Sequence, residues 1–369
     1  MGKEFTVTPY EVSGDIDYEK LLKDFGTQKI EASIIKNLRK THPLLKRGIY
    51  FSHRDLELWI KDAEAGKKVS IVSGRGPSEK MHLGHLVPFF AVKALQEQFN
   101  CHVYIPISED EKYFVKEKLS MEEAKKFADD NILDILALGF KAGKTFILKD
   151  FSYSKIYEYS AKIAKLINYS EVKSIFGLKP ESNIGWSFYP AVQAAHILLP
   201  QILEGPHRTI VPVGIDQDPF IRLTRDIAEH STIKLTKPGA IHAMFIPGLR
   251  GTSKMSSSDT ENEVIYLTDN PAEVKRKINK YAFSGGKDTL EEHRKHGGNP
   301  DVDISFQYLR MFFIDDDKEL KKIEDNYRSG KLLSGELKAI LIEKINAFLK
   351  EHQKAREKVK KDVGKYMLS

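Results

Sequence analysis

The sequence predicts an α/β protein built on a parallel sheet. Two observations carry this prediction: short β-branched runs alternate with helical patterns, and a Gly-rich turn separates the first run from its helix. Residues 69–72 are a β-branched run that ends at Gly74-Arg75-Gly76-Pro77, and an apolar helix from Leu86 and a second run at 102–105 follow. A strand, a Gly-rich turn, a helix and a strand form a βαβ unit, which requires parallel strands.

The same alternation continues further along the chain. Ser120-Met121-Glu122-Glu123 is a capping box that opens a helix to about residue 138. Residues 150–203 show mostly helical periodicity, and we therefore expect an insertion at about 107–208 that interrupts the α/β alternation. The sheet is expected to resume after it, with a strand at 209–214, a helix at 219–228 and a strand at 240–246.

Two further regions flank this core. Residues 1–68 are expected to form an N-terminal extension with a short strand at 6–10 and helices at 18–25 and 55–65. Asn270-Pro271-Ala272-Glu273 opens another helix, because it supplies a cap, a proline at the first helical position and a glutamate at the third. We therefore place a boundary near residue 270, with a core at 69–270. A helical domain at 271–369 follows, and its last helix is placed to pack back on the core.

The composition narrows the class of protein. With 41% hydrophobic and 30% charged residues, the chain is expected to be globular and soluble, without a secretory signal. A single cysteine, Cys101, excludes an internal disulfide framework and a cysteine zinc site, so a cytoplasmic location is expected. The longest apolar stretch, 189–200, is too short to span a bilayer and is interrupted by Gln193 and His196. A net charge of +6 permits a polyanionic partner.

The first candidate site is His82-Leu83-Gly84-His85 at the start of the apolar helix. Unpaired backbone N–H groups and the positive end of the helix dipole favour a phosphate there, and Gly84 lets a flat group approach the backbone. Ordinary polar residues at a helix start are the alternative interpretation. No carboxylate stands at metal-ligand spacing on the same turn, so we expect no metal. The preceding strand and Gly-Pro turn favour a nucleotide site.

The second candidate site is the loop Lys254-Met255-Ser256-Ser257-Ser258, which follows a Gly-rich stretch. A lysine is a point charge suited to a phosphate that becomes more negative as pyrophosphate departs, and serine hydroxyls can bind oxyanions. The alternative is a solvated serine loop. No G-x-x-x-x-G-K-S/T motif is present nearby, which disfavours a P-loop ATPase.

Together, in this order, the two segments resemble the HIGH and KMSKS signatures of class I aminoacyl-tRNA synthetases. Five other segments extend the resemblance to tryptophanyl-tRNA synthetases of the archaeal and eukaryotic type: 51–55, 110–113, 185–195, 214–219 and 282–286. The resemblance implies a Rossmann-like catalytic domain and a C-terminal all-helical anticodon-binding domain. It also implies ATP with Mg²⁺, tryptophan and tRNA(Trp) as substrates and partners, and a homodimer in the cytoplasm.

Residue roles follow from the resemblance at matching positions. It implies that His82, Gly84 and His85 bind ATP, and that Lys254 and Ser256 act on the departing phosphates beside Met255 and Ser257. It implies that Asp216 and Gln217 hold the ribose and the amino acid, and that Glu111 and Gln193 address the ammonium group. Val72 would line the amino-acid pocket, and Lys287 and Asp288 would contact tRNA.

Two positions depart from the family pattern. Where the family places a Tyr and a Gln against the indole N–H, this chain has Val72 and Pro106, neither of which offers a side-chain acceptor. An unpaired buried N–H costs about 1–3 kcal/mol, so another group must accept it. The rival interpretations are a tyrosyl-tRNA synthetase, a non-catalytic paralogue that binds tRNA, and a related nucleotidyltransferase.

Overall fold

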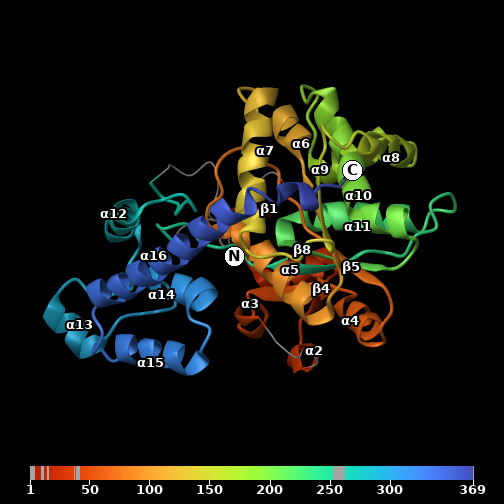
Figure 1. The fold of residues 1–369 in the computed structure, drawn as a ribbon. Coiled ribbons are helices and arrows are strands. Elements are labelled where there is room, and N and C mark those ends of the chain that lie inside the picture. The colour runs from red at the N-terminus through yellow and green to blue at the C-terminus, as the bar shows by residue number, and fades with distance from the viewer. Residues whose placement is uncertain are drawn as a thin grey trace. The chain divides into compact units, whose positions relative to one another are not determined.

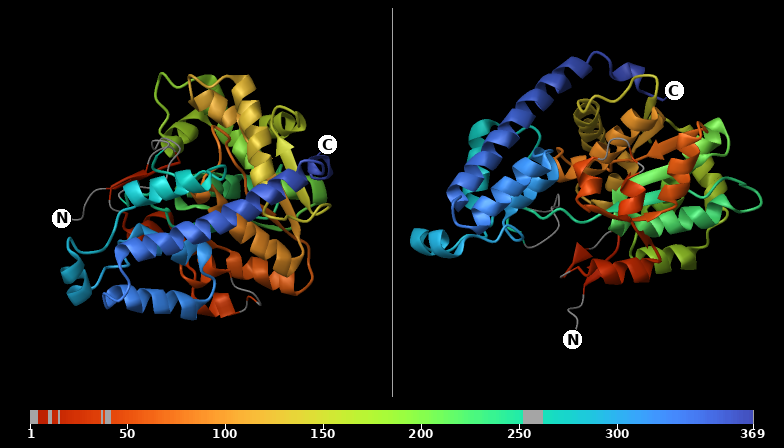
Figure 2. Two further views of the ribbon diagram at one scale, coloured as in Figure 1. Left: turned by 60° about the vertical axis from the view of Figure 1, so that its left-hand side comes forward. Right: turned by 90° about the horizontal axis from the view of Figure 1, so that it is seen from below.

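A computed structural model describes residues 5–9, 12–14, 16–36, 38, 42–251 and 262–368. The chain divides into two compact units (Figures 1 and 2). We call residues 1–80, 86–244 and 358–369 the sheet unit, and residues 81–85 and 245–357 the helical unit. A separate antiparallel ribbon of β1 (Thr6–Val7) and β2 (Val12–Ser13) lies near the N-terminus of the sheet unit.

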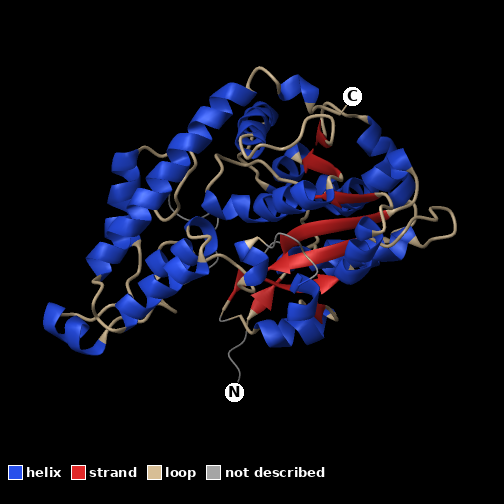
Figure 3. Cartoon of the chain, turned by 60° about the horizontal axis from the view of Figure 1, so that its bottom comes forward, coloured by secondary structure: helices blue, strands red, loops and turns tan. Residues whose placement is uncertain are grey.

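The sheet unit is organised around a sheet of seven strands, counted over the described residues (Figure 3). Five strands run parallel in the order β9-β8-β5-β6-β7, and β4 and β3 continue the sheet antiparallel beyond β9. The parallel order confirms the predicted α/β class. The strands are β3 (Gln28–Lys29), β4 (Tyr50–Arg54), β5 (Val69–Val72), β6 (His102–Ile107), β7 (Thr145–Lys149), β8 (Arg208–Gly214) and β9 (Gly239–Ala243).

Helices cover both faces of this sheet. Helices α5 (Leu86–Phe99) and α10 (Ile184–Glu204) both contact β5, β6 and β8, so they lie on opposite faces. Among the described helices, none combines the length and apolarity needed to cross a membrane. The other helices of the unit are α1 (Tyr18–Phe25), α2 (Ala32–Lys36), α3 (Pro43–Lys46), α4 (Leu56–Glu64), α6 (Glu109–Val115), α7 (Met121–Leu136), α8 (Lys155–Ala164), α9 (Tyr169–Phe176) and α11 (Asp218–Ala228).

The face of the sheet against α10 is defined by strand register. Val72 on β5 pairs with Tyr104 on β6, and Pro106 on β6 pairs with Leu148 on β7. Val72, Tyr104 and Leu148 belong to one buried cluster with residues of α10 such as Val192. Because alternate residues of a strand share a face, Pro106 lies on this same face. The result is an apolar layer between the central strands and α10.

Local signals explain where several helices begin. The Ser120 side chain accepts from the Glu123 N–H, and the Glu123 carboxylate accepts from the Ser120 N–H. These two bonds confirm the predicted capping box of α7. The Asn270 side chain accepts from the Glu273 N–H at 3.0 Å, and Pro271 follows, which confirms the predicted start of α12 (Pro271–Tyr281). The predicted helical region 150–203 is confirmed as α8, α9 and α10.

Three features differ from the expected organisation. Strands β3 and β4, which lie in the expected N-terminal extension, are part of the main sheet. Strand β7 was not predicted and lies inside the expected helical insertion, where it forms the edge of the sheet. The helical unit continues from Phe245, earlier than the expected boundary near residue 270. Each difference depends on long-range pairing, which local sequence patterns do not specify.

The helical unit consists mainly of helices joined by short loops. Leu337, Leu341 and Ile345 of the long helix α16 (Ser334–Val359, blue in Figure 2) are buried, as their spacing indicates. After this helix the chain rejoins the sheet unit, where Met367 pairs with Ile147 of β7. The remaining elements are α13 (Leu290–His296), α14 (Ile304–Tyr308), a π-helical turn (Leu309–Phe313) and α15 (Asp317–Arg328).

Candidate active site

The carboxyl ends of the parallel strands carry most of the predicted site residues of the sheet unit. Parallel sheets with helices on both faces bind ligands at this edge, because the loops there are free to carry polar groups. Val72 ends β5, Glu111 lies on α6 directly after β6, and Asp216 and Gln217 form the turn after β8. Gln193 comes from α10, on the face described above. The structure thus places Val72, Glu111 and the Asp216–Gln217 turn at one edge of the sheet.

The loop after β5 brings a half-buried cation to this edge. The Arg75 N–H donates to the Pro106 carbonyl at 2.9 Å, and the Ser108 N–H donates to the Arg75 carbonyl at 2.9 Å. Burial lowers the pKa of Arg75 to about 10, although the charges of Glu79 and Glu111 oppose the shift. Among the described residues, Nε and Nη2 of Arg75 have no hydrogen-bond acceptor. A charged guanidinium with unused donors is suited to bind an anionic ligand.

Glu111 lies close to the same loop. Its Oε1 accepts from the Lys112 ammonium at 2.8 Å, and its side chain is 16% exposed. A Cβ on Gly76 would collide with the other oxygen of Glu111, Oε2, so a glycine is required for this close approach. A half-buried carboxylate with a remaining oxygen is suited to bind an ammonium group.

Gln193 belongs to a polar series on α10 that the sequence did not reveal. Its Oε1 accepts from the Tyr189 hydroxyl at 2.8 Å and lies 3.5 Å from His196 Nδ1. His196 Nε2 lies 2.7 Å from Asp150 Oδ1, and both side chains are fully buried. These contacts to Tyr189 and His196 fix the orientation of the Gln193 carbonyl. In the sequence, the spacing of Gln193 and His196, two polar residues three positions apart on an apolar helix, was the available signal of this polar series.

The polar series ends in a cluster of three carboxyl groups, those of Glu109, Asp110 and Asp150. The Asp110 carboxyl accepts from the Glu111 N–H at 2.7 Å and from the Tyr157 hydroxyl at 3.2 Å. Burial raises the pKa of Asp110 to about 9 and that of Glu109 to about 7, and it also raises the pKa of Asp150. Burial lowers the pKa of His196 to about 4. Near neutral pH the cluster therefore holds protons on carboxyl groups and keeps the imidazole neutral.

The turn after β8 presents Asp216 and Gln217. The Gln217 amide donates to Asp216 Oδ2 at 3.3 Å, and Asp216 is 4% exposed. A Cβ on Gly214 would collide with Asp216 Oδ1, so this glycine permits the Asp216 side chain its position. Asp218, which follows Gln217, is fully buried and is bound by Arg54 and His242, so it is not available to a ligand. Burial opposes the shift, but these hydrogen bonds lower the pKa of Asp218 to about 2.

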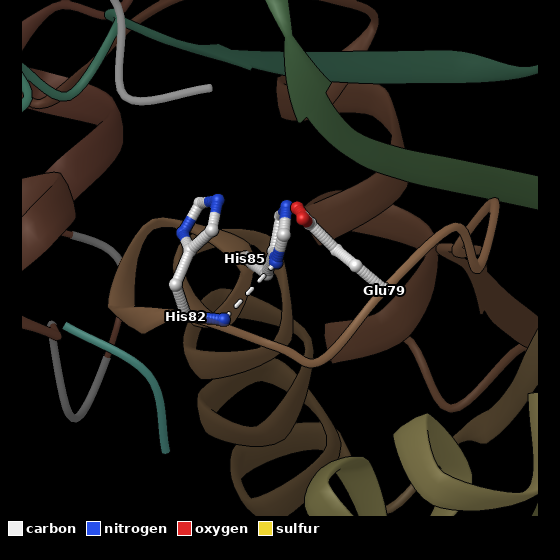
Figure 4. A group of neighbouring side chains, drawn as sticks. All are labelled: Glu79, His82 and His85. Atoms are coloured by element: carbon white, nitrogen blue, oxygen red, sulfur yellow. Dashed lines mark hydrogen bonds between the residues drawn. The ribbon is translucent and has the colours of Figure 1, made fainter. Parts of the chain in front are cut away.

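The two predicted histidines belong to the helical unit as defined above. Figure 4 shows their stacked rings, whose centroids are 3.5 Å apart, and the hydrogen bond from the His82 N–H to His85 Nδ1 at 3.2 Å. Gly84 lies between them in a 3₁₀ turn (Leu83–His85) that precedes α5 in the chain. His82 pairs with Tyr266 in a β-bridge, and the third residue drawn, Glu79, precedes His82 by three positions. The hydrogen bond makes Nδ1 of His85 an acceptor, which assigns its proton to Nε2 in the neutral ring.

The other predicted residues fall in two places. Lys287 and Asp288 are exposed in the loop between α12 and α13 of the helical unit. Lys254, Met255, Ser256 and Ser257 lie outside the described residues. Their predicted roles stay predictions from the sequence.

Comparison with known proteins identifies the family. The family model for tRNA synthetases class I (W and Y) matches residues 64–350. The protein named Tryptophan--tRNA ligase from Saccharolobus solfataricus is 51% identical to this chain, over 98% of this chain and 94% of its own length. The protein of the same name from Sulfurisphaera tokodaii is 50% identical, over 99% and 95% of the two chains.

Solved structures agree with the sequence comparison. The crystal structure of tryptophanyl-tRNA synthetase from Aeropyrum pernix superposes with a TM-score of 0.87 at 32% identity, over 95% of this chain and 96% of that chain. The tryptophanyl-tRNA synthetase from Giardia lamblia gives a TM-score of 0.86 at 36% identity, with the same coverage of the two chains. The fold is therefore that of the class I enzymes, with the Rossmann-like sheet that the resemblance implied. The chain belongs to the family of class I tRNA synthetases for tryptophan and tyrosine.

Proposed function

We propose that this protein activates tryptophan with ATP and transfers the product, tryptophanyl-adenylate, to tRNA(Trp). The observation that carries the proposal is likeness over nearly the whole chain to proteins named Tryptophan--tRNA ligase. The relatives at 45–51% identity share this name, which favours tryptophan over tyrosine as the substrate. The carboxyl edge of the sheet supplies a matching set of charges, with Arg75 for an anion and Glu111 for an ammonium.

The nucleotide would bind through the residues that the sequence assigned to it. His82, Gly84 and His85 would bind ATP, which enters as its Mg²⁺ complex. Asp216 would hold the ribose hydroxyl groups, because a carboxylate oxygen accepts two such donors. Lys254 would stabilise the departing phosphates, with Ser256, Met255 and Ser257 of the same loop beside it.

The amino acid would bind beside α10. Glu111 would neutralise the ammonium group, and the Gln193 side-chain carbonyl would accept one of its N–H donors. Gln217 would orient the carboxylate. Val72 would supply an apolar wall to the pocket, since it is buried on the face of the sheet that packs against α10.

The chemistry would then consist of two transfers. The tryptophan carboxylate attacks the α-phosphorus in line, and pyrophosphate leaves. The 2′-hydroxyl of the tRNA 3′ end then attacks the carbonyl carbon of the adenylate and takes the aminoacyl group, and AMP leaves. No enzyme nucleophile is needed, because positioning and charge stabilisation lower the barrier. Lys287 and Asp288 would contact the anticodon. A homodimer in the cytoplasm would be the working form.

Amino-acid-dependent exchange of pyrophosphate into ATP tests this function. Tryptophan alone should stimulate exchange among the standard amino acids, and the protein should then charge tRNA(Trp). Stimulation by tyrosine alone would favour the tyrosyl enzyme. No exchange from folded protein that still binds ATP and tRNA would favour a non-catalytic paralogue. Adenylyl transfer to a phosphorylated small molecule, without tRNA charging, would favour the nucleotidyltransferase.

A further inference from the structure

A tryptophan pocket must supply an acceptor for the indole N–H. A buried N–H without an acceptor loses its bond to water and gains nothing in exchange. Val72 and Pro106 lie on the face of the sheet that packs against α10, and neither side chain offers an acceptor. Any side-chain acceptor must therefore come from a neighbouring element on the same face.

Strand register places Asp150 next along that face. Pro106 pairs with Leu148 of β7, and Asp150 follows Leu148 by two residues. The Asp150 N–H donates to the Ile107 carbonyl at 3.4 Å, so the strand pairing extends to this residue. Residues two apart on a strand share a face, so Asp150 and Leu148 both face α10. The contact between Asp150 and His196 of α10 agrees with this placement.

One oxygen of the Asp150 carboxyl, Oδ2, is available to accept a hydrogen bond from a ligand. Oδ1 is engaged by His196 Nε2 at 2.7 Å, and Asp150 is 0% exposed. Oδ2 has no protein donor among the described residues by hydrogen-bond geometry. The neighbouring carboxyl of Asp110 can share a proton with Asp150, but each carboxylate oxygen has two lone pairs. One acceptor position therefore remains in a site from which water is excluded.

The other two carboxyl groups of the cluster fit the role less well. Each oxygen of Asp110 already accepts one hydrogen bond, from the Glu111 N–H and the Tyr157 hydroxyl. Neither is therefore as open to a new donor as Oδ2 of Asp150. Glu109 has an unused Oε1, but its Oε2 accepts from the Phe151 N–H at 3.4 Å and the structure gives it no bond to α10. Asp150 is the member that connects, through His196, to Gln193 of the amino-acid site.

We propose that Asp150, held in place by His196, accepts the indole N–H of bound tryptophan and so determines the specificity of the amino-acid pocket. This inference rests on the proposed function and adds a specificity residue to it. A group built to accept one N–H rejects an analogue that lacks it, because the buried oxygen is then left unpaired.

The test compares tryptophan with 3-benzothienylalanine, in which sulfur replaces the indole N–H. In pyrophosphate exchange, the wild-type kcat/KM should be about 10- to 100-fold higher for tryptophan. In Asp150→Ala the ratio should fall to near one, and in Asp150→Asn, which keeps the volume of the side chain, it should also fall. Glu109→Gln is the matched control from the same cluster and should keep the wild-type ratio. A ratio taken within one preparation does not depend on the fraction of protein that is folded.

The outcomes separate this inference from the proposed function. If Asp150 bound the ammonium group instead, both substrates would lose the same factor in Asp150→Ala, and the unchanged ratio would overturn the inference alone. A ratio that collapses in Glu109→Gln but persists in the Asp150 variants would also overturn it. Wild-type protein that does not activate tryptophan would overturn the proposed function together with the inference.

Discussion

The guanidinium of Arg54, the last residue of β4, binds both carboxylate oxygens of Asp218, the first residue of α11. Nε lies 2.7 Å from Oδ1 and Nη2 lies 2.8 Å from Oδ2, and only 13% of the Arg54 side chain is exposed. This bidentate pair joins β4 to the end of the turn that carries Asp216 and Gln217. Asp218 therefore positions the turn and is not available to a ligand.

Removal of Arg54 is expected to destabilise the sheet unit strongly. Arg54→Ala leaves the buried Asp218 carboxylate without its main partner, which should lower the free energy of unfolding by about 3 kcal/mol. Arg54→Lys keeps the charge but loses the planar fork, so its loss should be smaller. Denaturant unfolding followed by circular dichroism measures both changes.

An exposed ion pair provides the control for this prediction. Lys162 and Glu158 form an i,i+4 pair on α8 with side chains 63% and 65% exposed. Lys162→Ala should leave the free energy of unfolding nearly unchanged, because solvent screens the pair. Equal effects of Arg54→Ala and Lys162→Ala would show that the buried pair has no special role.

Gly214→Ala is expected to impair ATP binding more than folding. The added methyl group would occupy the position of Asp216 Oδ1, and this carboxylate can move aside because it ends a side chain. The KM for ATP in pyrophosphate exchange should rise about tenfold, which corresponds to the loss of one charged hydrogen bond. Gly335→Ala, where no atom lies near the added methyl group, should leave the KM unchanged. An unchanged KM in Gly214→Ala would argue against a role of Asp216 in ATP binding.

The buried carboxyl of Glu109 predicts a pH dependence of stability. Burial raises the pKa of Glu109 from 4.5 to about 7, so the folded state keeps a proton that the unfolded state releases. Its contribution is therefore fully present below pH 4.5 and is lost as the pH rises through 7. Glu109→Gln should remove this dependence, worth up to about 3 kcal/mol, and should stabilise the protein at pH 8 relative to wild type. Parallel stability curves for the two proteins from pH 4.5 to 8 would contradict the assignment.

Most of the sheet was predictable because its signals are local. The β-branched run 69–72, the Gly-rich turn and the caps of α7 and α12 each act within a few residues. Strand β7 escaped prediction because its three-residue apolar run, Phe146-Ile147-Leu148, also fits a buried helix segment. Strand β4 joins the sheet through antiparallel pairing with β9, which lies far away in sequence.

The site was predictable only as far as its motifs extend. Asp216 and Gln217 follow a recognisable strand and turn, and the structure places them at the carboxyl edge of the sheet. The bond between Asp150 and His196 joins residues 46 positions apart on different elements, so no spacing rule applies to it. The roles of neighbouring carboxyl groups depend on burial and on which oxygen is already bonded, and these are properties of the folded chain.

Lys254→Ala is expected to reduce turnover by about 10²–10³-fold. The lost charge would act on the departing phosphates, so adenylate formation should fall far more than the affinity for tryptophan. Single-turnover kinetics and equilibrium binding of tryptophan measure the two effects separately. Lys354→Ala, which removes an exposed lysine paired with Glu351 in the helical unit, is the control. Unchanged turnover in Lys254→Ala would remove this lysine from the mechanism.

Deletion of residues 363–369 is expected to expose the edge strand β7. The Ile147 N–H donates to the Tyr366 carbonyl at 2.7 Å, and the Leu368 N–H donates to the Ile147 carbonyl at 2.7 Å, so the C-terminal segment covers this edge. The Tyr366 hydroxyl also donates to the Phe140 carbonyl at 3.0 Å. An uncovered edge presents unpaired backbone groups that favour association with other chains.

Hydrogen exchange of the Ile147 amide measures this protection directly. The truncated protein should exchange this amide much faster than wild type and should aggregate at lower protein concentration. Tyr366→Phe removes one hydrogen bond but keeps the backbone pairing, so it should cost about 1 kcal/mol and leave the Ile147 amide protected. Unaltered exchange at Ile147 in the truncated protein would mean that the sheet holds its edge without the C-terminal segment.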